Sequence, residues 1–384
     1  MKKKIYIILT YLVVFLNSNS LSDNSNNKLK IGLLVPFSGE YQELGNSFLF
    51  SIQLALEEIG DKNILIIPRD SGSNDPKKLI QGIKEISAEG AKIIIGPINF
   101  DEIEEAKKYP NMIFISPSNM NPEIQKNIIS IGISLESQLV SLKKFLENKK
   151  KNRTVILYPD DRHAPIIEDK IKKVNLKNFK KFKYSSDPKI LTGEIETLTS
   201  YAQRKRNLES RKKILEKKDT EKAERELKKL EQIYTLGKVN FDSVIIIDFG
   251  NRLRSVLTSL IFTDVNQNEV LFTTVNQWFD ESIFYENSLK ELYYPSINYK
   301  NFAKYNKNFI KSFNVKPNEI TILAYDALGL IYYVWKKNKS VNSIKDFITK
   351  DKIKGKIGTF SFQDNKIFQD LKIYRAKDKS FKVY

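Results

Sequence analysis

Short runs of hydrophobic residues recur along the chain and are separated by longer segments in which apolar residues follow helical spacing. The strands expected from these runs lie at 30–36, 64–68, 92–95, 112–116, 154–158, 178–184, 243–247 and 269–273. Mostly apolar strands are typical of a buried parallel sheet, and amphipathic segments between them are typical of helices that cover it. The pattern therefore predicts an α/β protein with two lobes, each a doubly wound parallel sheet.

Helix boundaries are marked by polar residues. Asp75-Pro76 combines an N-capping side chain with a proline, which favours the first helical position. Helices are expected at 48–59, 101–108, 165–174, 193–206 and 321–335. At the end of the chain we expect two edge strands, 358–362 and 370–375, with a turn at Gln363-Asp364-Asn365.

The segment 201–237 is far more charged than its surroundings. Residues 204–231 contain 12 basic and 7 acidic side chains. Opposite charges four residues apart, such as Glu209 with Lys213 and Glu221 with Arg225, support exposed helices. Asp219-Thr220 interrupts the pattern and can cap a second helix, so we expect a helical hairpin inserted in the second lobe. Two interpretations are open: a docking arm for a partner, an anionic lipid surface or the cell wall, and a solvated hairpin with a structural role only.

The N-terminal residues have the form of an export signal. Three lysines at 2–4 precede an apolar run at 5–16, and small polar residues follow at 17–20. This order predicts a secretory signal peptide over 1–22 and a periplasmic location. The alternative is an uncleaved membrane anchor, but the run is shorter than the roughly 20 residues that span a bilayer.

Composition excludes several kinds of chemistry. The 384 residues include no cysteine and one histidine, and Lys and Arg outnumber Asp and Glu by 64 to 46, a net charge of +18. Disulfides, thiol nucleophiles, a lipid-modified N-terminal cysteine, and cysteine or multi-histidine metal sites are therefore impossible, and no cofactor or metal is expected. Positive charge can indicate nucleic-acid binding. Here glutamates are interspersed with the lysines and the chain is expected to be exported, so no nucleic-acid partner is expected.

Four short motifs occur in a characteristic order. They are KIGLLVPFSG at 30–39, Asp75-Pro76, Ile95-Gly96-Pro97, and Ile115-Ser116-Pro117-Ser118 followed by Asn121-Pro122-Glu123. With them the chain resembles the Leu/Ile/Val-binding protein family, the type I periplasmic binding proteins. The charged hairpin, DFGNRLR at 248–254 and LAYDA at 323–327 make it most similar to the penicillin-binding-protein-activator-like branch of alphaproteobacteria.

The resemblance implies two lobes joined by three crossings, expected near 131–134, 294–296 and 358–359. Lobe one would then comprise 28–132 and 296–357, and lobe two 133–294 and 358–384, with the hairpin 201–237 in lobe two. Such a hinge allows the lobes to close on a small-molecule ligand in the cleft between them.

Candidate ligand-binding residues follow from the rule that ligands lie beyond the carboxyl ends of parallel strands. Hydroxyl groups and free N–H groups at helix starts can hold a carboxylate there. On lobe one the candidates are Ser38, Gly39, Asn99, Phe100, Ser116, Ser118 and Asn119. On lobe two they are His163, Asp248, Asn251, Asn276 and Trp278.

The candidate site departs from that of the amino-acid-binding members. Asn99 or Phe100 stands where those members have a serine after the third strand, and Met120 where they have a threonine. Asn276 stands where they have the acidic residue that holds the ligand's ammonium group, and the tyrosine of lobe two falls at or next to His163. These differences argue against an amino-acid ligand.

The only histidine, His163, has three interpretations: a general base, a ligand or interlobe contact, and a surface residue at the cleft mouth. No nucleophile-elbow motif accompanies it, so the sequence contains no motif that supports a hydrolase, and no enzymatic activity is predicted. The sequence favours a non-enzymatic periplasmic receptor, most like a penicillin-binding-protein activator that contacts a cell-wall synthase. The alternative is the solute-binding component of an ABC transporter, which would bind an amino acid or related small solute and an ABC permease.

Overall fold

The computed structural model describes residues 28–119, 124–176, 179–275, 278–279, 283–284, 289–363 and 366–384, without the side chains of Phe100 and Gln363. The expected signal peptide and Asn276 lie outside these residues. Within them, no helix combines the length and the hydropathy needed to cross a membrane.

Lobe one is built on a five-stranded sheet in the order β2-β1-β3-β4-β5, with every pair parallel. The strands are β1 (Leu29–Val35), β2 (Ile64–Asp70), β3 (Ile93–Ile95), β4 (Ile113–Ser116) and β5 (Ile128–Ser130). Successive side chains of β1 point to opposite faces of the sheet. On one face, Leu33 packs in the core under α2 (Gln42–Ile59) and α12 (Ile322–Asn338). Leu34 joins the core under α3 (Pro76–Ala88) and α4 (Phe100–Ala106). Helices therefore cover both faces of this sheet.

Lobe two is built on a seven-stranded sheet in the order β15-β14-β10-β9-β8-β6-β7. The parallel strands are β6 (Thr154–Pro159), β7 (Phe179–Tyr184), β8 (Ser243–Ile246), β9 (Leu271–Thr274) and β10 (Leu292–Ser296), and β14 (Lys372–Lys377) and β15 (Ser380–Val383) add an antiparallel edge. One face packs on α5 (Leu135–Asn148) and α6 (Ala164–Lys173). The other face packs on α7 (Pro188–Thr199) and α10 (Gly250–Phe262). The predicted α/β class with two parallel-sheet lobes is confirmed.

A third, small sheet corrects the prediction for the end of the chain. β12 (Thr359–Gln363) and β13 (Lys366–Gln369) form an antiparallel hairpin that also pairs with β11 (Ile353–Lys354). The side chains of Phe360 and Ile367 are buried and join the main hydrophobic core, which holds this sheet in place. Of the expected turn, Gln363 belongs to β12 and the other two residues lie outside the described residues. The strand expected at 370–375 corresponds to β14.

The helix predicted at 193–206 is two helices. Ser200 adopts a left-handed backbone conformation, φ 53°, and separates α7 from α8 (Tyr201–Glu216). Its N–H donates to the carbonyl oxygen of Thr197, which closes the end of α7. A residue other than glycine rarely takes this conformation, so the pattern of apolar residues alone did not reveal the break.

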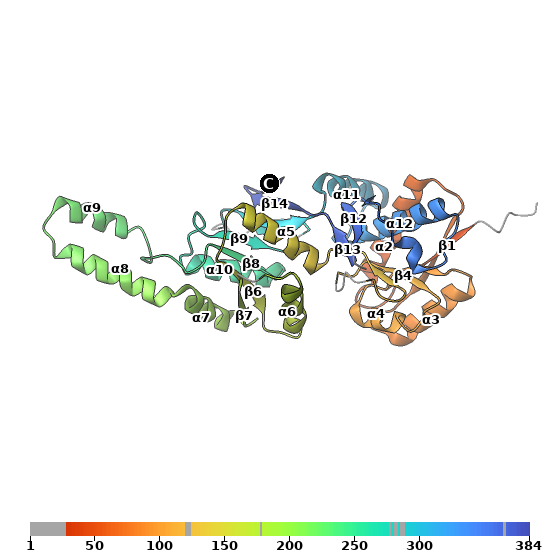
Figure 1. Cartoon of the computed structure of the whole chain (residues 1–384), viewed down its shortest axis with the longest axis horizontal. Helices are drawn as coiled ribbons and strands as arrows, with labels where there is room; N and C mark the ends of the chain where they lie inside the picture. Colours follow the sequence, from red (N-terminus) through yellow and green to blue (C-terminus); the bar gives the residue numbers. More distant parts are fainter. Residues whose placement is uncertain are drawn as a thin grey trace, which may run out of the picture.

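The predicted helical hairpin is present and extends away from the sheet of lobe two (Figure 1). We call α8 and α9 (Glu221–Leu230) the arm. Thr220 caps α9 by accepting from the Ala223 N–H, and Arg211 pairs with Glu226 across the two helices. The arm has a separate small core formed by Leu208, Leu215, Ala223 and Leu230. The arm is therefore a packed unit, not a pair of isolated helices.

The two lobes are connected by short passages of the chain. One lies between β5 and α5 and another between β10 and α11 (Tyr299–Phe313). The last lies between β13 and β14, later than the 358–359 expected, because the chain first forms β12 and β13 beside lobe one (Figure 1). The Gln369 side chain at the end of β13 donates to the carbonyl oxygens of Ile131, at 3.1 Å, and Gly132, at 2.7 Å. Two of these passages are thus bonded to each other.

Candidate functional site

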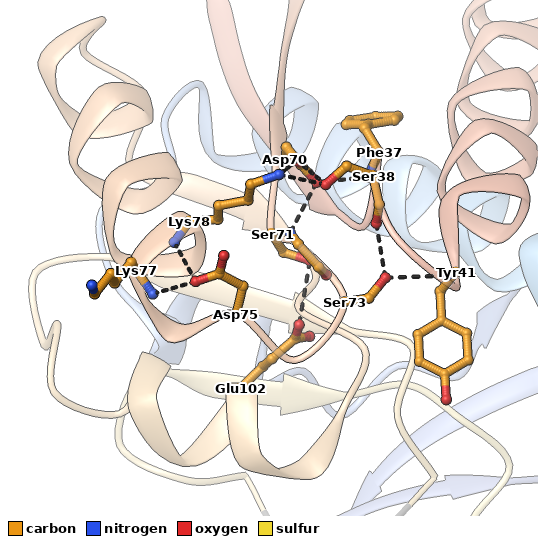
Figure 2. A network of polar contacts seen from close by, with 11 residues as sticks. Phe37, Ser38, Tyr41, Asp70, Ser71, Ser73, Asp75, Lys77, Lys78 and Glu102 are labelled. Atoms are coloured by element: carbon orange, nitrogen blue, oxygen red, sulfur yellow. Dashed lines mark hydrogen bonds and ion pairs between the residues drawn. The ribbon is translucent and has the colours of Figure 1, made fainter.

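The carboxyl ends of β1 and β2 meet in a network centred on Asp70 (Figure 2). The Ser38 hydroxyl donates to Asp70 Oδ2 at 2.6 Å, and Lys78 Nζ donates to the same oxygen at 3.0 Å and to Ser38 Oγ at 2.6 Å. Asp70 Oδ1 accepts from the Phe37 and Gly72 N–H groups. The Ser38 hydroxyl is therefore held within lobe one.

The charge of Asp70 is stabilised by these contacts. Burial raises the pKa of its carboxyl group, but the hydrogen bonds from Ser38, Gly72, Lys78 and Phe37 outweigh that effect and bring the pKa to about 2. An ionised carboxylate that accepts several hydrogen bonds fixes the groups that donate them. Asp70 therefore orders the loop after β1. Sequence reasoning missed it because its partners in that loop, Phe37 and Ser38, lie more than thirty positions away.

Gly39 has a conformational role in the same loop. Its φ is +77°, and a Cβ atom there would lie 2.7 Å from Ser73 Oγ. That oxygen accepts from the Tyr41 N–H, and the Ser73 hydroxyl donates to the Ser38 carbonyl oxygen (Figure 2). Glycine is required here by the turn and by the close approach of Ser73.

Asn99 begins α4 and forms a capping box with Glu102, which could have been read from the spacing Asn-x-x-Glu. Glu102 is buried, and its carboxylate accepts from the Asn99 N–H at 3.3 Å and from the Ser71 hydroxyl at 3.4 Å. Burial raises the pKa of Glu102 to about 7, despite the hydrogen bonds that lower it. The start of α4 thus contains a buried carboxyl group whose pKa is raised towards neutral pH.

The serines after β4 also bind within their own lobe. The Ser116 hydroxyl donates to the Pro97 carbonyl oxygen at 2.5 Å and accepts from the Ser118 N–H at 3.2 Å. Ser118 in turn accepts from the Gly132 N–H through its carbonyl oxygen. Both serines are buried, so of this group it is Asn119 that reaches the opposite lobe.

A pocket of about 290 Å³ lies where Asn119 faces the strand ends of lobe two. Its charged and polar side includes Asp161, His163, Lys170, Asp248 and Arg252. Its apolar side is formed by Leu135, Ile166, Ile167, Ile247, Phe249 and Val275. The structure therefore brings together three of the predicted residues, Asn119, His163 and Asp248, at an interlobe pocket.

Asp248 is the buried centre of the polar side. It accepts from the Tyr184 hydroxyl at 2.6 Å, from the Phe249 N–H at 2.8 Å and from Arg252 Nε at 3.0 Å. Arg252 also pairs with Asp161 at 3.2 Å. Burial and the neighbouring Asp248 carboxylate hold the pKa of Tyr184 well above its usual range. The hydroxyl therefore stays protonated and donates a hydrogen bond to Asp248.

His163 lies at the rim of this pocket and is exposed. Its main-chain N–H donates to Asp161 Oδ1 at 2.8 Å, and its Nε2 accepts from Arg162 Nε at 3.2 Å. Both contacts are with its immediate neighbours. Among the described residues no group of three or more His, Asp or Glu side chains could hold a metal ion.

The other candidates lie elsewhere or are not described. Asn251 is exposed on α10 and accepts from Arg254, and Trp278 packs towards Phe302 of α11, with ring centroids 6.5 Å apart. Neither lines the interlobe pocket. Asn276 and the side chain of Phe100 fall outside the described residues.

Sequence reasoning missed Gln138, Lys170 and Arg252 in the pocket. Lys170 is buried and pairs at 3.0 Å with the buried Glu136, whose other oxygen lies 3.5 Å from Lys366 Nζ. The four-residue spacing of Asp248 and Arg252 could have indicated their contact. Lys170 and Gln138 reach the pocket through the packing of α5 and α6, for which the sequence carries no local signal.

Two helix-covered parallel sheets with a pocket at their facing strand ends define the type I periplasmic binding protein fold. Residues 28–174 match the sequence profile of a family described as periplasmic binding protein. No curated protein matches the sequence.

Solved structures confirm the expected resemblance at the level of the fold. The leucine-binding protein LivK of Thermotoga maritima is 12% identical, with a TM-score of 0.61 over 93% of this chain and 97% of that one. The C-domain of LpoA from Haemophilus influenzae, described as a regulator of PBP1A, is 14% identical, with a TM-score of 0.61 over 92% and 99%. A putative branched-chain amino acid ABC transporter protein from Rhodospirillum rubrum is 10% identical, with a TM-score of 0.68 over 93% and 100%.

Proposed function

We propose that the protein is a non-enzymatic receptor of the periplasm that acts through protein contacts, as a regulator of a cell-wall synthase. The observation that carries this proposal is the arm, a separately packed helical hairpin that extends from lobe two on the side away from lobe one (Figure 1). LpoA, which has the same fold, is described as a regulator of PBP1A.

The arm has a surface suited to an acidic partner. Lys213, Ile214, Lys217 and Lys218, which we call the arm tip, are exposed at the end of α8, and Ile214 is 50% exposed. Lys213 and Lys217, the residue that caps α8, are four residues apart and so lie on the same side of the helix end, and Lys218 follows directly. An apolar side chain among basic ones complements an acidic surface that has an apolar pocket at its centre.

The cleft side of lobe one supports the same proposal. Ser38 and Ser116, the hydroxyl groups expected to receive a ligand, already bind Asp70 and Pro97. Their use by a ligand would require these bonds to break, which lowers the binding free energy that the ligand gains. The cleft is therefore less suited to a small solute than the predicted residues alone indicated.

The test is binding to the purified ectodomain of a PBP1A-type synthase from the same organism, followed by biolayer interferometry. The arm-tip variant Lys213→Glu/Lys217→Glu/Lys218→Glu is compared with Lys62→Glu/Lys84→Glu/Lys92→Glu, which makes the same charge change on exposed sites of lobe one. We expect the arm-tip variant to bind about tenfold more weakly or worse, and the control to bind like the wild type. Wild type that does not bind refutes the regulator, and equal binding by all three refutes docking through the arm tip.

The second candidate function, solute binding for an ABC transporter, is favoured by the interlobe pocket to which Asn119 contributes. A thermal-shift panel of amino acids and small organic acids tests it. A ligand at 100 times its Kd would stabilise the protein by about 2.7 kcal/mol. A rise in Tm that is lost in Asp248→Asn favours transport, whereas a flat panel together with synthase binding favours the regulator.

A further inference from the structure

A second and larger cavity lies on lobe one, apart from the interlobe pocket. Its volume is about 670 Å³, and it is lined by α2, the start of α11, α12 and the segment 352–360. It has no lining residue in common with the interlobe pocket. Small-molecule sites are typically clefts of about 300–1,000 Å³ with an apolar lining and a few polar groups.

One side of this cavity is aromatic and aliphatic. Tyr325 and Tyr333 lie eight residues apart on α12, with Leu330 between them, and Ile353 and Phe360 face them from β11 and β12. Tyrosine rings present a rigid apolar surface whose ordering costs little conformational entropy. This side of the cavity is suited to a flat ring.

The other side of the cavity is polar. Its acidic side chains are engaged by neighbouring groups, whereas two of its lysines are exposed. Glu58 is already occupied, since it pairs with Lys356 at 2.7 Å and accepts from the Tyr325 hydroxyl. Asp326 is buried and accepts from the Lys356 and Ile357 N–H groups. Lys352 and Lys354 are exposed, and no carboxylate of the described residues is within ion-pair distance of either. An anion that enters the cavity therefore meets two exposed lysines, while the carboxylates of Glu58 and Asp326, which also line it, are held by other partners.

The rim that carries these lysines is fixed before any ligand binds. The two N–H groups that bind Asp326 belong to the loop between β11 and β12, and the Gly355 N–H donates to the Gly358 carbonyl oxygen at 2.7 Å. A Cβ atom at Gly355 would lie 2.5 Å from Asp326 Oδ2, so only glycine lets the loop approach the carboxylate this closely. A preformed rim reduces the entropy that binding costs.

Gly329 is an exposed glycine that keeps one side of the cavity open. It lies in the middle of α12, where glycine is disfavoured relative to alanine, yet a Cβ atom there would meet nothing within 4 Å. Packing therefore does not require this glycine. It lines the cavity, and any side chain at this position would project into the space.

We propose that this cavity binds a small organic anion that contains a flat ring, with the ring on the apolar side between Tyr325 and Tyr333 and the anionic group at Lys352 and Lys354. The site goes beyond the proposed function, since it uses neither the arm nor the interlobe pocket. Together the helices and strands around the cavity supply what such a ligand requires: an apolar wall, exposed positive charge, a fixed rim and an open centre.

The experiment titrates the full-length protein with benzoate and nicotinate, and with the uncharged analogues benzamide and nicotinamide, using NMR. We expect saturable binding of at least one anion with a Kd of about 1 mM or tighter, and binding of its uncharged analogue at least about tenfold weaker. Gly329→Leu should abolish binding by filling the cavity. Gly193→Leu is the matched control, because Gly193 is an exposed glycine in α7 whose Cβ would also meet nothing within 4 Å.

The outcomes separate this site from the rest of the molecule. Lys352→Gln/Lys354→Gln should weaken the anion about tenfold and leave the analogue unchanged. If no probe saturates, or if the anion binds equally to Gly329→Leu and is lost in Asp248→Asn, the proposal is overturned. Synthase binding by Gly329→Leu is measured in parallel. We expect it to be unchanged, so that failure of this site and failure of the regulator remain distinguishable.

Discussion

The guanidinium group of Arg204, in the first turn of α8, donates to the main-chain carbonyl oxygen of Thr263 at the end of α10, at 2.8 Å from Nη2 and 3.3 Å from Nη1. Nη2 also donates to Thr235 Oγ1 at 2.8 Å, on the chain that returns from α9. Arg204 is 4% exposed. One buried side chain thus joins both ends of the arm to the helix that covers the sheet of lobe two.

Replacing Arg204 by methionine keeps an apolar stem but removes these hydrogen bonds. Hydrogen bonds to a charged group contribute about 1.5–3 kcal/mol, so we expect local opening of the arm to become easier by an amount of this order. Hydrogen exchange followed by mass spectrometry should show faster exchange over 201–236 and unchanged exchange in β1 and β3. Arg206→Met, at an exposed position that contacts Gln203, is the control, and equal exchange in the two variants would contradict the anchoring role.

The raised pKa of Glu102 predicts how the stability of the protein depends on pH. Its pKa is about 7 in the folded protein and near 4.5 in the unfolded chain, so between these values the folded state binds more protons. The contribution of Glu102 to stability is therefore complete below about pH 4.5 and is lost as the pH rises to 7, by up to about 3 kcal/mol. In Glu102→Gln the free energy of unfolding should depend less on pH over this window, as measured by urea denaturation.

The control for this prediction is Glu104→Gln, an exposed position on the same helix, α4. It should keep the pH dependence of the wild type. If Glu102→Gln and Glu104→Gln have the same pH profile, then Glu102 does not titrate near neutral pH in the folded protein.

Asp70 should respond to pH in the opposite sense. Its folded pKa of about 2 lies below the ordinary value of 3.8, so it stabilises the fold above about pH 4 and loses this effect as the pH falls towards 2. Asp70→Asn should cost about 2 kcal/mol at pH 7 and clearly less at pH 3. Lys78→Met removes the exposed partner alone and should cost under about 1 kcal/mol at pH 7. A cost of Asp70→Asn that is the same at both pH values would refute this assignment.

Tyr184 and Asp248 should be coupled in stability. Tyr184→Phe removes the hydroxyl that donates to Asp248 Oδ2 and should cost about 1–3 kcal/mol, because the buried carboxylate loses a donor. Asp248→Asn should cost at least as much, since Arg252 also loses one of its two charged partners and keeps only Asp161. In a double-mutant cycle the two changes together should cost less than their sum by about 1 kcal/mol. Additive costs would show that the bond contributes nothing to stability.

The sequence predicted the parts of the fold that depend on local pattern. Each expected strand overlaps an observed one, because strands buried on both faces must be apolar along their length. The arm was predicted because its charged pairs and the cap at Thr220 are local features. The break at Ser200 was missed because a left-handed serine has no sequence signature, and the small sheet of β11 to β13 was missed because its pairing is tertiary.

The site was less predictable than the fold for the same reason. The rule for parallel sheets located Ser38, Ser116 and Asp248 at strand ends, and they are there. It could not say what each side chain contacts, so Ser38 and Ser116 were expected to face a ligand although they bind residues of their own lobe. Contacts such as Lys170 with Glu136 depend on how α5 meets α6, which no spacing in the sequence encodes.

The bond from Gln369 to the carbonyl oxygens of Ile131 and Gly132 has a mechanical consequence. Two connecting strands that are tied side by side cannot rotate independently, so they act as a single flexure, and the passage before α11 is the second support. A body held by two supports swings about the line that joins them and resists twisting around any other axis. The bond thus favours rotation of the lobes about that line over other relative motions, and in Gln369→Ala we expect the two connecting segments to move independently.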